Sequence, residues 1–288
     1  MEDALVRVVD LCKVYNPGEN EVRALDHVNL EIYKGEFVAI IGQSGSGKSI
    51  TMKGVMGILP KNGKVVEGSV MFQGNDLTKY SERQMQQVRG SEIAMIFQDP
   101  MTSLNPTMKV GKQIEEMLKE HRKEMSKADR KARAIELLSL VGISNPEARY
   151  DQYPHQLSGG MRQRVVIAIA LACDPKVLIA DEPTTALDVT IQAQILDLMK
   201  DLQKKTGMGI IFITHNLGVV ADICDKVSVM YAGKIVEQGP VDDIFYEPAH
   251  PYTKGLLRSM PRVDAESYER LIPIEGTPVD MLNPPEGC

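Results

Sequence analysis

The eight residues Gly42–Ser49, with the sequence GQSGSGKS, constrain the fold of this chain more than any other stretch. They match the pattern G-x-x-x-x-G-K-[ST], in which a glycine-rich backbone turns its N–H groups inward around a phosphate. The continuous apolar run Glu36–Ile41 precedes the pattern and predicts a buried parallel strand, and Ser49–Met56 can follow as a helix. A strand, a glycine-rich loop and a helix N-terminus in this order predict an α/β fold with a nucleotide-phosphate site.

The residue types inside this loop suggest how each residue would contact a nucleotide. Lys48 would reach the β- and γ-phosphates, and the hydroxyl of Ser49 would ligate Mg²⁺. The phosphate cradle is expected to include the other loop residues and the one that follows: Gly42, Ser44, Gly45, Ser46, Gly47 and Ile50. The alternative is a chance glycine-rich turn, but the strand before the loop and the helix after it favour the nucleotide site.

Two carboxylates follow another apolar strand, Val177–Ala180. Ligands of parallel sheets bind at the carboxyl ends of the strands, where Asp181 and Glu182 would lie. Asp181 would hold Mg²⁺ through water, and Glu182 would polarise the water that attacks the γ-phosphate. Either carboxylate alone would be interpreted as a solvated turn residue. Two in succession, in a chain with a phosphate loop, favour a nucleotide hydrolase.

Two further polar residues end predicted strands. Gln98 follows Ile93–Phe97 and could touch Mg²⁺ or the attacking water from a mobile loop. His215 follows Ile210–Ile213 and could donate a hydrogen bond to the γ-phosphate in the transition state. A lone glutamine or histidine after a strand is usually solvated or structural. The strand-end position that both share with Asp181 favours a catalytic role.

A second helix start with small residues occurs in Leu157–Arg164, with the sequence LSGGMRQR. Ser158, Gly159 and Gly160 would open a helix over Met161–Cys173, and a helix N-terminus is a site for an anion. The long separation from the first loop leaves open whether both stretches bind the same phosphate. Two half-sites for one nucleotide suggest that two chains close around it.

Composition excludes several classes of protein. The 288 residues carry a formal net charge of −6, and the most basic stretch, Lys119–Arg133, has seven basic and three acidic residues interleaved at helical spacing. This spacing favours a solvated helix over a nucleic-acid surface. The four cysteines lack C-x-x-C spacing, so neither a disulfide framework nor a zinc site is indicated, and a reducing compartment fits. The sequence predicts neither a signal peptide nor a membrane span.

The chain changes character twice along its length. Residues 100–170 contain two helical patterns, Val110–Glu124 and Lys127–Leu140, and are predicted to be a helical insertion in the α/β core. From residue 247 onward, repeated prolines predict a tail rather than a continuation of the sheet. The expected domains are therefore 1–246, with a helical subdomain at about 100–170, and 247–288.

Six motifs occur in the order found in the ATPase subunits of ABC transporters: the phosphate loop, Gln98, LSGGMRQR, ADEP, TTALD and His215. The chain resembles these subunits over roughly residues 4–245. The resemblance implies that Tyr15 stacks on adenine and that Gln98 belongs to a lid loop coupled to a membrane subunit. It also implies that Ser158–Gly160 grip the γ-phosphate of ATP held by the opposite subunit, and that Asp188 links the two sites across a dimer.

Three stretches are similar to the oligopeptide/dipeptide importers of this family: Gln98–Pro106, Pro248–Lys254 and Pro284–Cys288. In relatives the C-terminal extension continues past the Gly-Cys pair with further cysteines, and in some relatives these cysteines hold an iron–sulfur cluster. Cys288 supplies a single thiolate, which cannot hold such a cluster. A cluster is therefore expected only if the native chain continues past Cys288. Ile50 stands where many ABC ATPases have a second hydroxyl residue, and the metal-facing residue remains Ser49.

The resemblance implies an ABC-type P-loop NTPase, with a RecA-like α/β core, an antiparallel β subdomain, a helical insertion and a Pro-rich extension. ATP and Mg²⁺ would be its cofactors. Two subunits, self-copies or paralogues, would form a head-to-tail dimer around two ATP molecules. The implied partners are transmembrane permease subunits and, indirectly, an extracytoplasmic peptide-binding protein, with no nucleic acid. The chain would lie at the cytoplasmic face of the membrane, where closure and reopening of the dimer would energise import of peptides or related small solutes.

Two alternatives compete with a transport ATPase. The first is a non-transport ABC ATPase of the DNA-repair or translation-factor type. A repair ATPase would carry a long coiled coil between the phosphate loop and LSGGMRQR, and a translation factor usually carries two such cassettes; this sequence has neither. The second is a switch that binds ATP without turnover, against which Glu182 and His215 argue.

Overall fold

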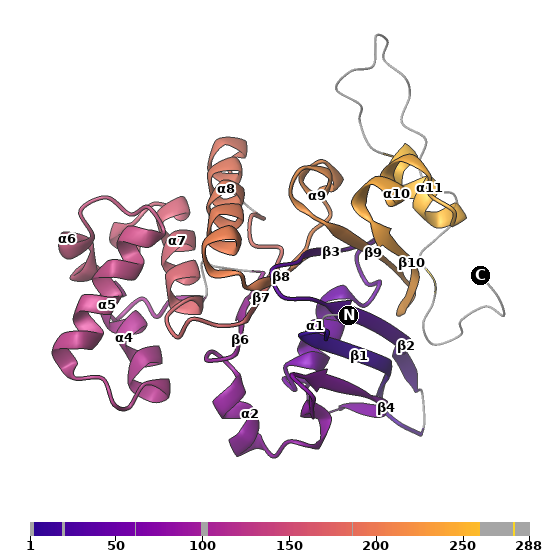
Figure 1. The fold of residues 1–288 in the computed structure, drawn as a ribbon, viewed down its shortest axis with the longest axis horizontal. Coiled ribbons are helices and arrows are strands. Elements are labelled where there is room, and N and C mark those ends of the chain that lie inside the picture. Colours follow the sequence, from indigo (N-terminus) through magenta and orange to yellow (C-terminus); the bar gives the residue numbers. More distant parts are fainter. Residues whose placement is uncertain are drawn as a thin grey trace, which may run out of the picture. The chain divides into compact units, whose positions relative to one another are not determined.

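The computed structural model of the chain describes residues 3–18, 21–60, 62–98, 103–185, 187–259 and 279. The described residues form two compact units, one drawn from residues 1–79 and 213–288 and the other from residues 80–212. Figure 1 colours the elements along the chain and labels them. The N-terminal and C-terminal parts of the chain therefore share one unit, and the middle of the chain builds the other.

The first unit contains an antiparallel sheet with the strand order β2-β1-β4-β5. Its strands are β1 (Val6–Tyr15), β2 (Val22–Ile32), β4 (Gly63–Phe72) and β5 (Asn75–Asp76). The ladders on both sides of β1 are irregular near Asp10, His27 and Gly68, which all have positive φ. A Cβ at Gly68 would overlap the backbone of Asp10, so this bulge requires a glycine.

The same unit contains a second run of strands in the order β10-β9-β3. Strand β3 (Phe37–Ile41) pairs in parallel with β9 (Lys226–Tyr231), and β9 pairs antiparallel with β10 (Lys234–Pro240). All five side chains of β3 are buried, as expected for a continuous apolar strand. The helices of this unit are α1 (Lys48–Val55), α9 (Leu217–Ile223), α10 (Val241–Tyr246) and α11 (Pro251–Arg258), with a short 3₁₀ turn, η1 (Leu77–Lys79).

The second unit begins with α2 (Glu82–Val88) and contains strands in the order β8-β7-β6. These are β6 (Ile93–Ile96), β7 (Val177–Asp181) and β8 (Gly209–Ile213), and β6 and β7 run parallel. Between β6 and β7 lie α4 (Val110–His121), α5 (Lys127–Leu140), α6 (Pro146–Tyr150), η2 (Pro154–Gln156) and α7 (Gly159–Ala170). The long helix α8 (Val189–Thr206) connects β7 to β8.

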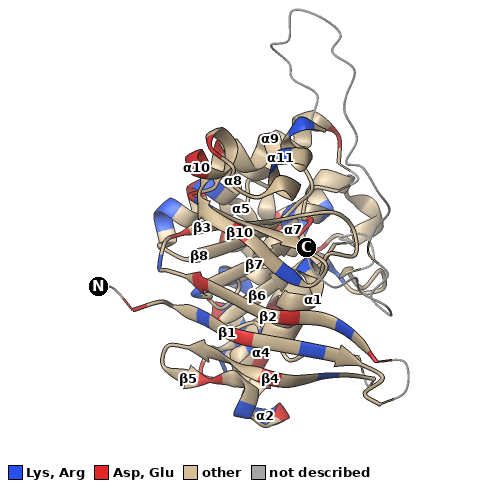
Figure 2. Ribbon diagram, turned by 90° about the vertical axis from the view of Figure 1, so that its right-hand side faces the viewer, with Lys and Arg blue, Asp and Glu red and all other residues tan. Residues whose placement is uncertain are grey.

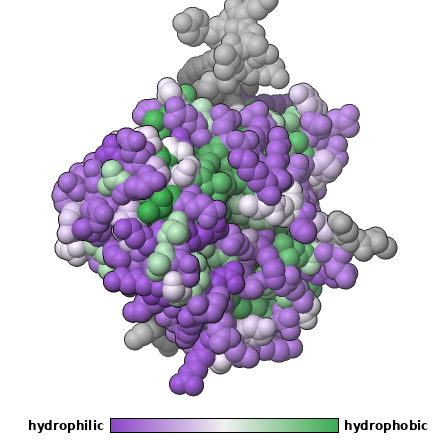
Figure 3. Space-filling view, turned by 60° about the vertical axis from the view of Figure 1, so that its left-hand side comes forward, coloured by the Kyte–Doolittle hydropathy of each residue, from purple (hydrophilic) through white to green (hydrophobic). Residues whose placement is uncertain are grey.

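The surface mixes charges of both signs. Acidic and basic residues both occur along β1 and β2 (Figure 2), and the Arg7 guanidinium lies 2.7 Å from the Glu31 carboxylate across these strands. On the face drawn in Figure 3, hydrophilic side chains predominate and hydrophobic ones form smaller groups among them. In the described ranges, none of the helices is long and apolar enough to cross a membrane.

Candidate nucleotide-binding site

The phosphate loop connects β3 to α1 in the first unit. Gly42, Gly45 and Gly47 have φ values of +147°, +83° and +105°, which favour glycine. At Gly42 a Cβ would also overlap the carbonyl oxygen of Met230, so the loop passes the end of β9 at backbone distance. The path of the loop therefore depends on its glycines.

Lys48 lies against the backbone of this loop and is 7% exposed. Its Nζ donates to the carbonyl oxygen of Gly42 at 2.7 Å and to that of Gln43 at 2.8 Å. A buried ammonium needs such partners, and phosphate oxygens could replace them. The burial of the other loop residues varies: Ser46 is buried, Ser49 and Ile50 are half-buried, and Ser44 and Gly45 are exposed.

Tyr15 ends β1 and is half-buried. It contacts Lys13, which is fully buried and was not predicted as part of the site. The Lys13 ammonium donates to the Tyr15 hydroxyl at 2.6 Å and lies 3.9 Å from the centre of its ring. The i, i+2 spacing in a strand was the signal that could have revealed it, because residues two apart point to one face.

His215 is exposed two residues after the end of β8. Its neighbour Asn216 caps α9, accepting the backbone N–H of Val219 at 3.3 Å, and the N–H of Asn216 donates to the Thr214 hydroxyl at 3.0 Å. These two hydrogen bonds fix the backbone on one side of the histidine. His215 therefore stands on a structured turn at a strand end.

The structure brings Gln98 and Glu182 together in the second unit. The parallel register places Ile96 opposite Ala180, so the two strands end side by side. The Gln98 amide donates to Oε2 of Glu182 at 3.0 Å, and the Thr185 hydroxyl donates to the same oxygen at 3.0 Å. Glu182 has a φ of +49°, unusual for a residue with a side chain. Its carboxylate is thus held in one orientation by two donors, and the role of Thr185 was not predicted.

Asp181 ends β7 with 2% exposure, next to Glu182. The helix α7 is tied to the same segment by Gln163, which is fully buried and donates to the carbonyl oxygen of Pro183 at 2.5 Å. A buried carboxylate at the end of a parallel strand can accept a cation. Asp181, Ser49 and Gln98 each carry a side-chain oxygen, the kind of ligand that Mg²⁺ prefers, so these residue types fit the predicted ion.

The LSGGMRQR stretch forms the start of α7. Ser158 is the N-cap, and its hydroxyl accepts the N–H of Met161 at 3.4 Å. Ser158 and Gly159 are exposed, and a Cβ at Gly159 would meet no described atom within 4 Å. At Gly160 a Cβ would press on the Ile191 side chain at 2.7 Å. The first of the two glycines therefore leaves open surface at a helix N-terminus, and the second permits packing on α8.

Asp188 is exposed and caps α8, with its carboxylate accepting the N–H of Ile191 at 2.9 Å. The predicted site residues are divided between the two units. Tyr15, the phosphate loop with Ile50, and His215 belong to the first unit. The second unit holds Gln98, Asp181, Glu182, the start of α7 and Asp188.

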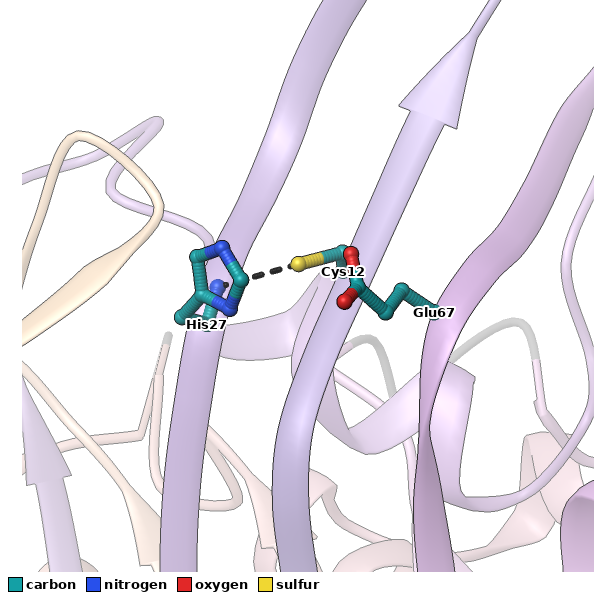
Figure 4. A group of neighbouring side chains, drawn as sticks. All are labelled: Cys12, His27 and Glu67. Carbon is teal, nitrogen blue, oxygen red and sulfur yellow. Dashed lines mark hydrogen bonds between the residues drawn. The ribbon is translucent and has the colours of Figure 1, made fainter.

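A separate group of possible metal donors lies on the antiparallel sheet of the first unit (Figure 4). Cys12, His27 and Glu67 come from β1, β2 and β4, and their donor atoms lie within 4.8 Å of one another. Cys12 is buried, and its sulfur accepts the backbone N–H of His27 at 3.2 Å. Thiolate and imidazole ligands suit Zn²⁺ rather than Mg²⁺, so this group differs in kind from the ligands predicted for the nucleotide's metal.

Several predicted features fall outside the described residues. They include Cys288 with its neighbours from Pro284, and residues 99–102 of the lid loop. The described cysteines, Cys12, Cys173 and Cys224, are each buried and form no disulfide among the described residues. These residues give no support to an iron–sulfur cluster.

Comparison with known proteins identifies the class to which this fold and these motifs belong. The family described as ABC transporter matches residues 25–185. The chain therefore belongs to the ABC transporter family and is an ABC-type ATPase. More particularly, residues 236–288 match the C-terminal region of oligopeptide/dipeptide transporters.

Relatives of known name agree with this assignment. The oligopeptide transport ATP-binding protein OppD of Bacillus subtilis is 61% identical over 98% of this chain and 79% of its own length. The dipeptide transport ATP-binding protein DppD of Lactococcus lactis subsp. cremoris is 56% identical over 99% of this chain and 82% of its own.

Solved structures confirm the ABC ATPase fold. A dimeric, post-hydrolysis structure of the ATP-binding cassette MJ0796, bound to ADP and Pi, is 31% identical, with a TM-score of 0.73, over 82% of this chain and 98% of its own. The structure of cbiO1 from Clostridium perfringens, part of the transporter complex cbiONQ, is 33% identical, with a TM-score of 0.74, over 85% of this chain and 92% of its own.

Proposed function

We propose that this chain is the ATP-hydrolysing subunit that energises import of peptides, or related small solutes, through a membrane ABC transporter. The observation that carries the proposal is the combination of an ATPase domain with the C-terminal region of oligopeptide/dipeptide transporters in one chain. The names of the relatives support it, because they are oligopeptide and dipeptide transport proteins matched over nearly all of this chain. A DNA-repair or translation role is not favoured.

The first unit would bind the nucleotide. Tyr15 would stack on adenine, and the backbone of Gly42–Ile50 would surround the phosphates. Lys48 would exchange the carbonyl oxygens of Gly42 and Gln43 for the β- and γ-phosphates, which offer it full negative charge. His215, exposed on its turn, would donate to the γ-phosphate as charge develops there.

The second unit would supply the hydrolytic groups. Glu182 would orient and polarise the attacking water, and the hydrogen bonds from Gln98 and Thr185 support this role because they hold its carboxylate in one orientation. Ser49, Gln98 and Asp181 would hold Mg²⁺. When bound, the ion neutralises charge on the transferring phosphoryl group. The protein would contribute positioning and charge stabilisation, with no covalent intermediate on the enzyme.

Two chains would complete each site. The start of α7, Ser158–Gly160, would contact the γ-phosphate held by the opposite chain. Its helix N-terminus and the open surface at Gly159 support a role as an anion site. Asp188 would connect the two sites across the dimer. The second chain would be a self-copy or a paralogue.

The dimer would act on transmembrane permease subunits through the region Gln98–Val110, at the cytoplasmic face of the membrane. A peptide-binding protein on the other side would deliver the solute to the permease. The domains proposed for these tasks are 1–246 for the ATPase, with its helical subdomain at about 100–170, and 247–288 for the extension.

An uptake assay tests the proposed function in the cell. The native chain is replaced by Glu182→Gln, and uptake of radiolabelled dipeptides and oligopeptides is compared with uptake of a free amino acid. We expect peptide uptake to fall at least about a hundredfold, because positioned general-base catalysis contributes about 10²–10⁴ to rate, while amino-acid uptake stays unchanged. Unchanged peptide uptake would reject this function.

A further inference from the structure

The helix α11 brings a buried tyrosine to the start of the phosphate loop. Tyr252 is 8% exposed, and its hydroxyl accepts the backbone N–H of Gln43 at 2.9 Å. Its ring packs against that of Tyr231, the last residue of β9, with the ring centres 4.5 Å apart. A residue of the C-terminal region therefore contacts a loop that lies 209 positions earlier in the chain.

The start of α11 is held in place by a carboxylate from β10. Glu237 accepts the backbone N–H of Ala249 at 2.6 Å and that of His250 at 3.2 Å. His250 in turn caps the helix, because its Nδ1 accepts the N–H of Tyr252 at 3.1 Å. Burial acts to raise the pKa of Glu237, but its hydrogen-bond partners, the two N–H groups among them, outweigh it and hold the pKa below its usual value. The carboxylate is therefore charged at neutral pH, and Tyr252 stands on an anchored helix.

The contact with Tyr252 leads directly to Lys48. The N–H of Gln43 and the carbonyl of Gly42 are the two ends of one peptide group. Tyr252 binds the N–H end, and the Lys48 ammonium donates to the carbonyl end at 2.7 Å. Hydrogen bonds at both ends of a peptide polarise it in the same sense and reinforce each other. The hydroxyl of Tyr252 thus fixes the peptide on which the phosphate-binding lysine rests.

We propose that Tyr252 is a positioning residue for the phosphate loop, and that through it the C-terminal region sets the affinity for nucleotide. The proposal rests on the proposed role of Gly42–Ser49 in binding phosphate. Without the hydroxyl, the N–H of Gln43 would turn to water, and the first peptide of the loop would have to be reordered whenever a nucleotide binds. The free-energy cost of this reordering weakens nucleotide binding rather than the hydrolytic step, because the loop is displaced and the hydrolytic group is not.

The test is Tyr252→Phe in the full chain, which keeps the ring on Tyr231 and removes the hydroxyl alone. We expect the Kd for Mg·ATP and for Mg·ADP to rise about five- to tenfold, the usual effect of losing one partly buried hydrogen bond. The Tm of the nucleotide-free chain should stay within about 2 °C of wild type, since the loop relaxes to water. Hydrogen exchange over residues 42–49 should become faster.

Tyr246→Phe is the matched control, because Tyr246 lies in the same C-terminal region and is 82% exposed. It should leave the Kd values and the exchange rates unchanged. Wild-type Kd values in Tyr252→Phe would overturn the inference, and so would a lower Tm with unchanged affinity, which marks a packing role. Failure of the wild-type chain to bind Mg·ATP would instead overturn the proposed function, and this inference with it.

Discussion

Lys13 is an unusual residue for the interior of a sheet, because lysine is almost never fully buried. Its contact with the hydroxyl and ring of Tyr15 gives the ammonium a partner inside the protein. Burying an ammonium is costly unless it gains a strong contact. We interpret the contact that offsets this cost as the means of fixing the Tyr15 ring, on which adenine is proposed to stack.

Lys13→Met tests this interpretation at the scale of a single residue. Methionine fills similar space without the charge, so we expect the Tm to stay within about 2 °C of wild type or to rise. The Kd for ATP should rise about three- to tenfold, because the Tyr15 ring loses the contact that orients it. Lys79→Met, at a side chain 81% exposed, is the control. A lower Tm with unchanged affinity would show that Lys13 only supports the fold.

Single residues were predictable from sequence where the chemistry is local. The phosphate loop and the Asp181-Glu182 pair are short patterns next to apolar strands, and their residue types are enough to propose a site. The bond between Gln98 and Glu182 joins residues 84 positions apart. It depends on β6 and β7 being neighbours, which no local pattern contains.

Elements were predictable where the hydrophobic period and the caps agree. Helix α5 has the predicted bounds, Lys127–Leu140, and the side chain of Ser126 caps it by accepting the N–H of Asp129 at 3.2 Å. Helix α7 begins at Gly159 rather than Met161, because Ser158 is its cap. Helix α11 was not predicted, because the repeated prolines from residue 247 onward indicate a tail, yet one of them, Pro251, suits the first helical turn that it occupies.

Gly159→Ala separates the folding of α7 from its proposed contact with a second chain. Alanine is the better helix former, and its Cβ would meet no described atom within 4 Å, so we expect an equal or higher Tm. If this helix start contacts ATP in the opposite subunit, the added methyl intrudes on that contact. ATP-dependent dimerisation, measured by light scattering in a Glu182→Gln background, should weaken about tenfold. Dimerisation equal to that of the parent would contradict the contact.

At the scale of the molecule, the predicted site is divided between two units of the chain, and the start of α7 at Ser158 and Gly159 is exposed. The strand order β10-β9-β3 and the contact of α11 with the phosphate loop come from residues far apart in sequence. Composition and motif spacing predict the class of fold, but they contain no information on such long-range pairing. Only the tertiary structure reveals that the C-terminal region contacts the phosphate loop.

The most direct test of the account is ATP turnover and ATP-dependent dimerisation of the purified chain beside Glu182→Gln. Removing the proposed base should abolish turnover while ATP binding persists, so the variant should accumulate as a dimer in Mg·ATP and the wild type should cycle. A wild type that binds ATP but neither turns over nor dimerises alone would show that a paralogous subunit completes the site. Turnover by Glu182→Gln at the wild-type rate would contradict the assignment of the catalytic base, and a chain that does not bind ATP would contradict the account as a whole.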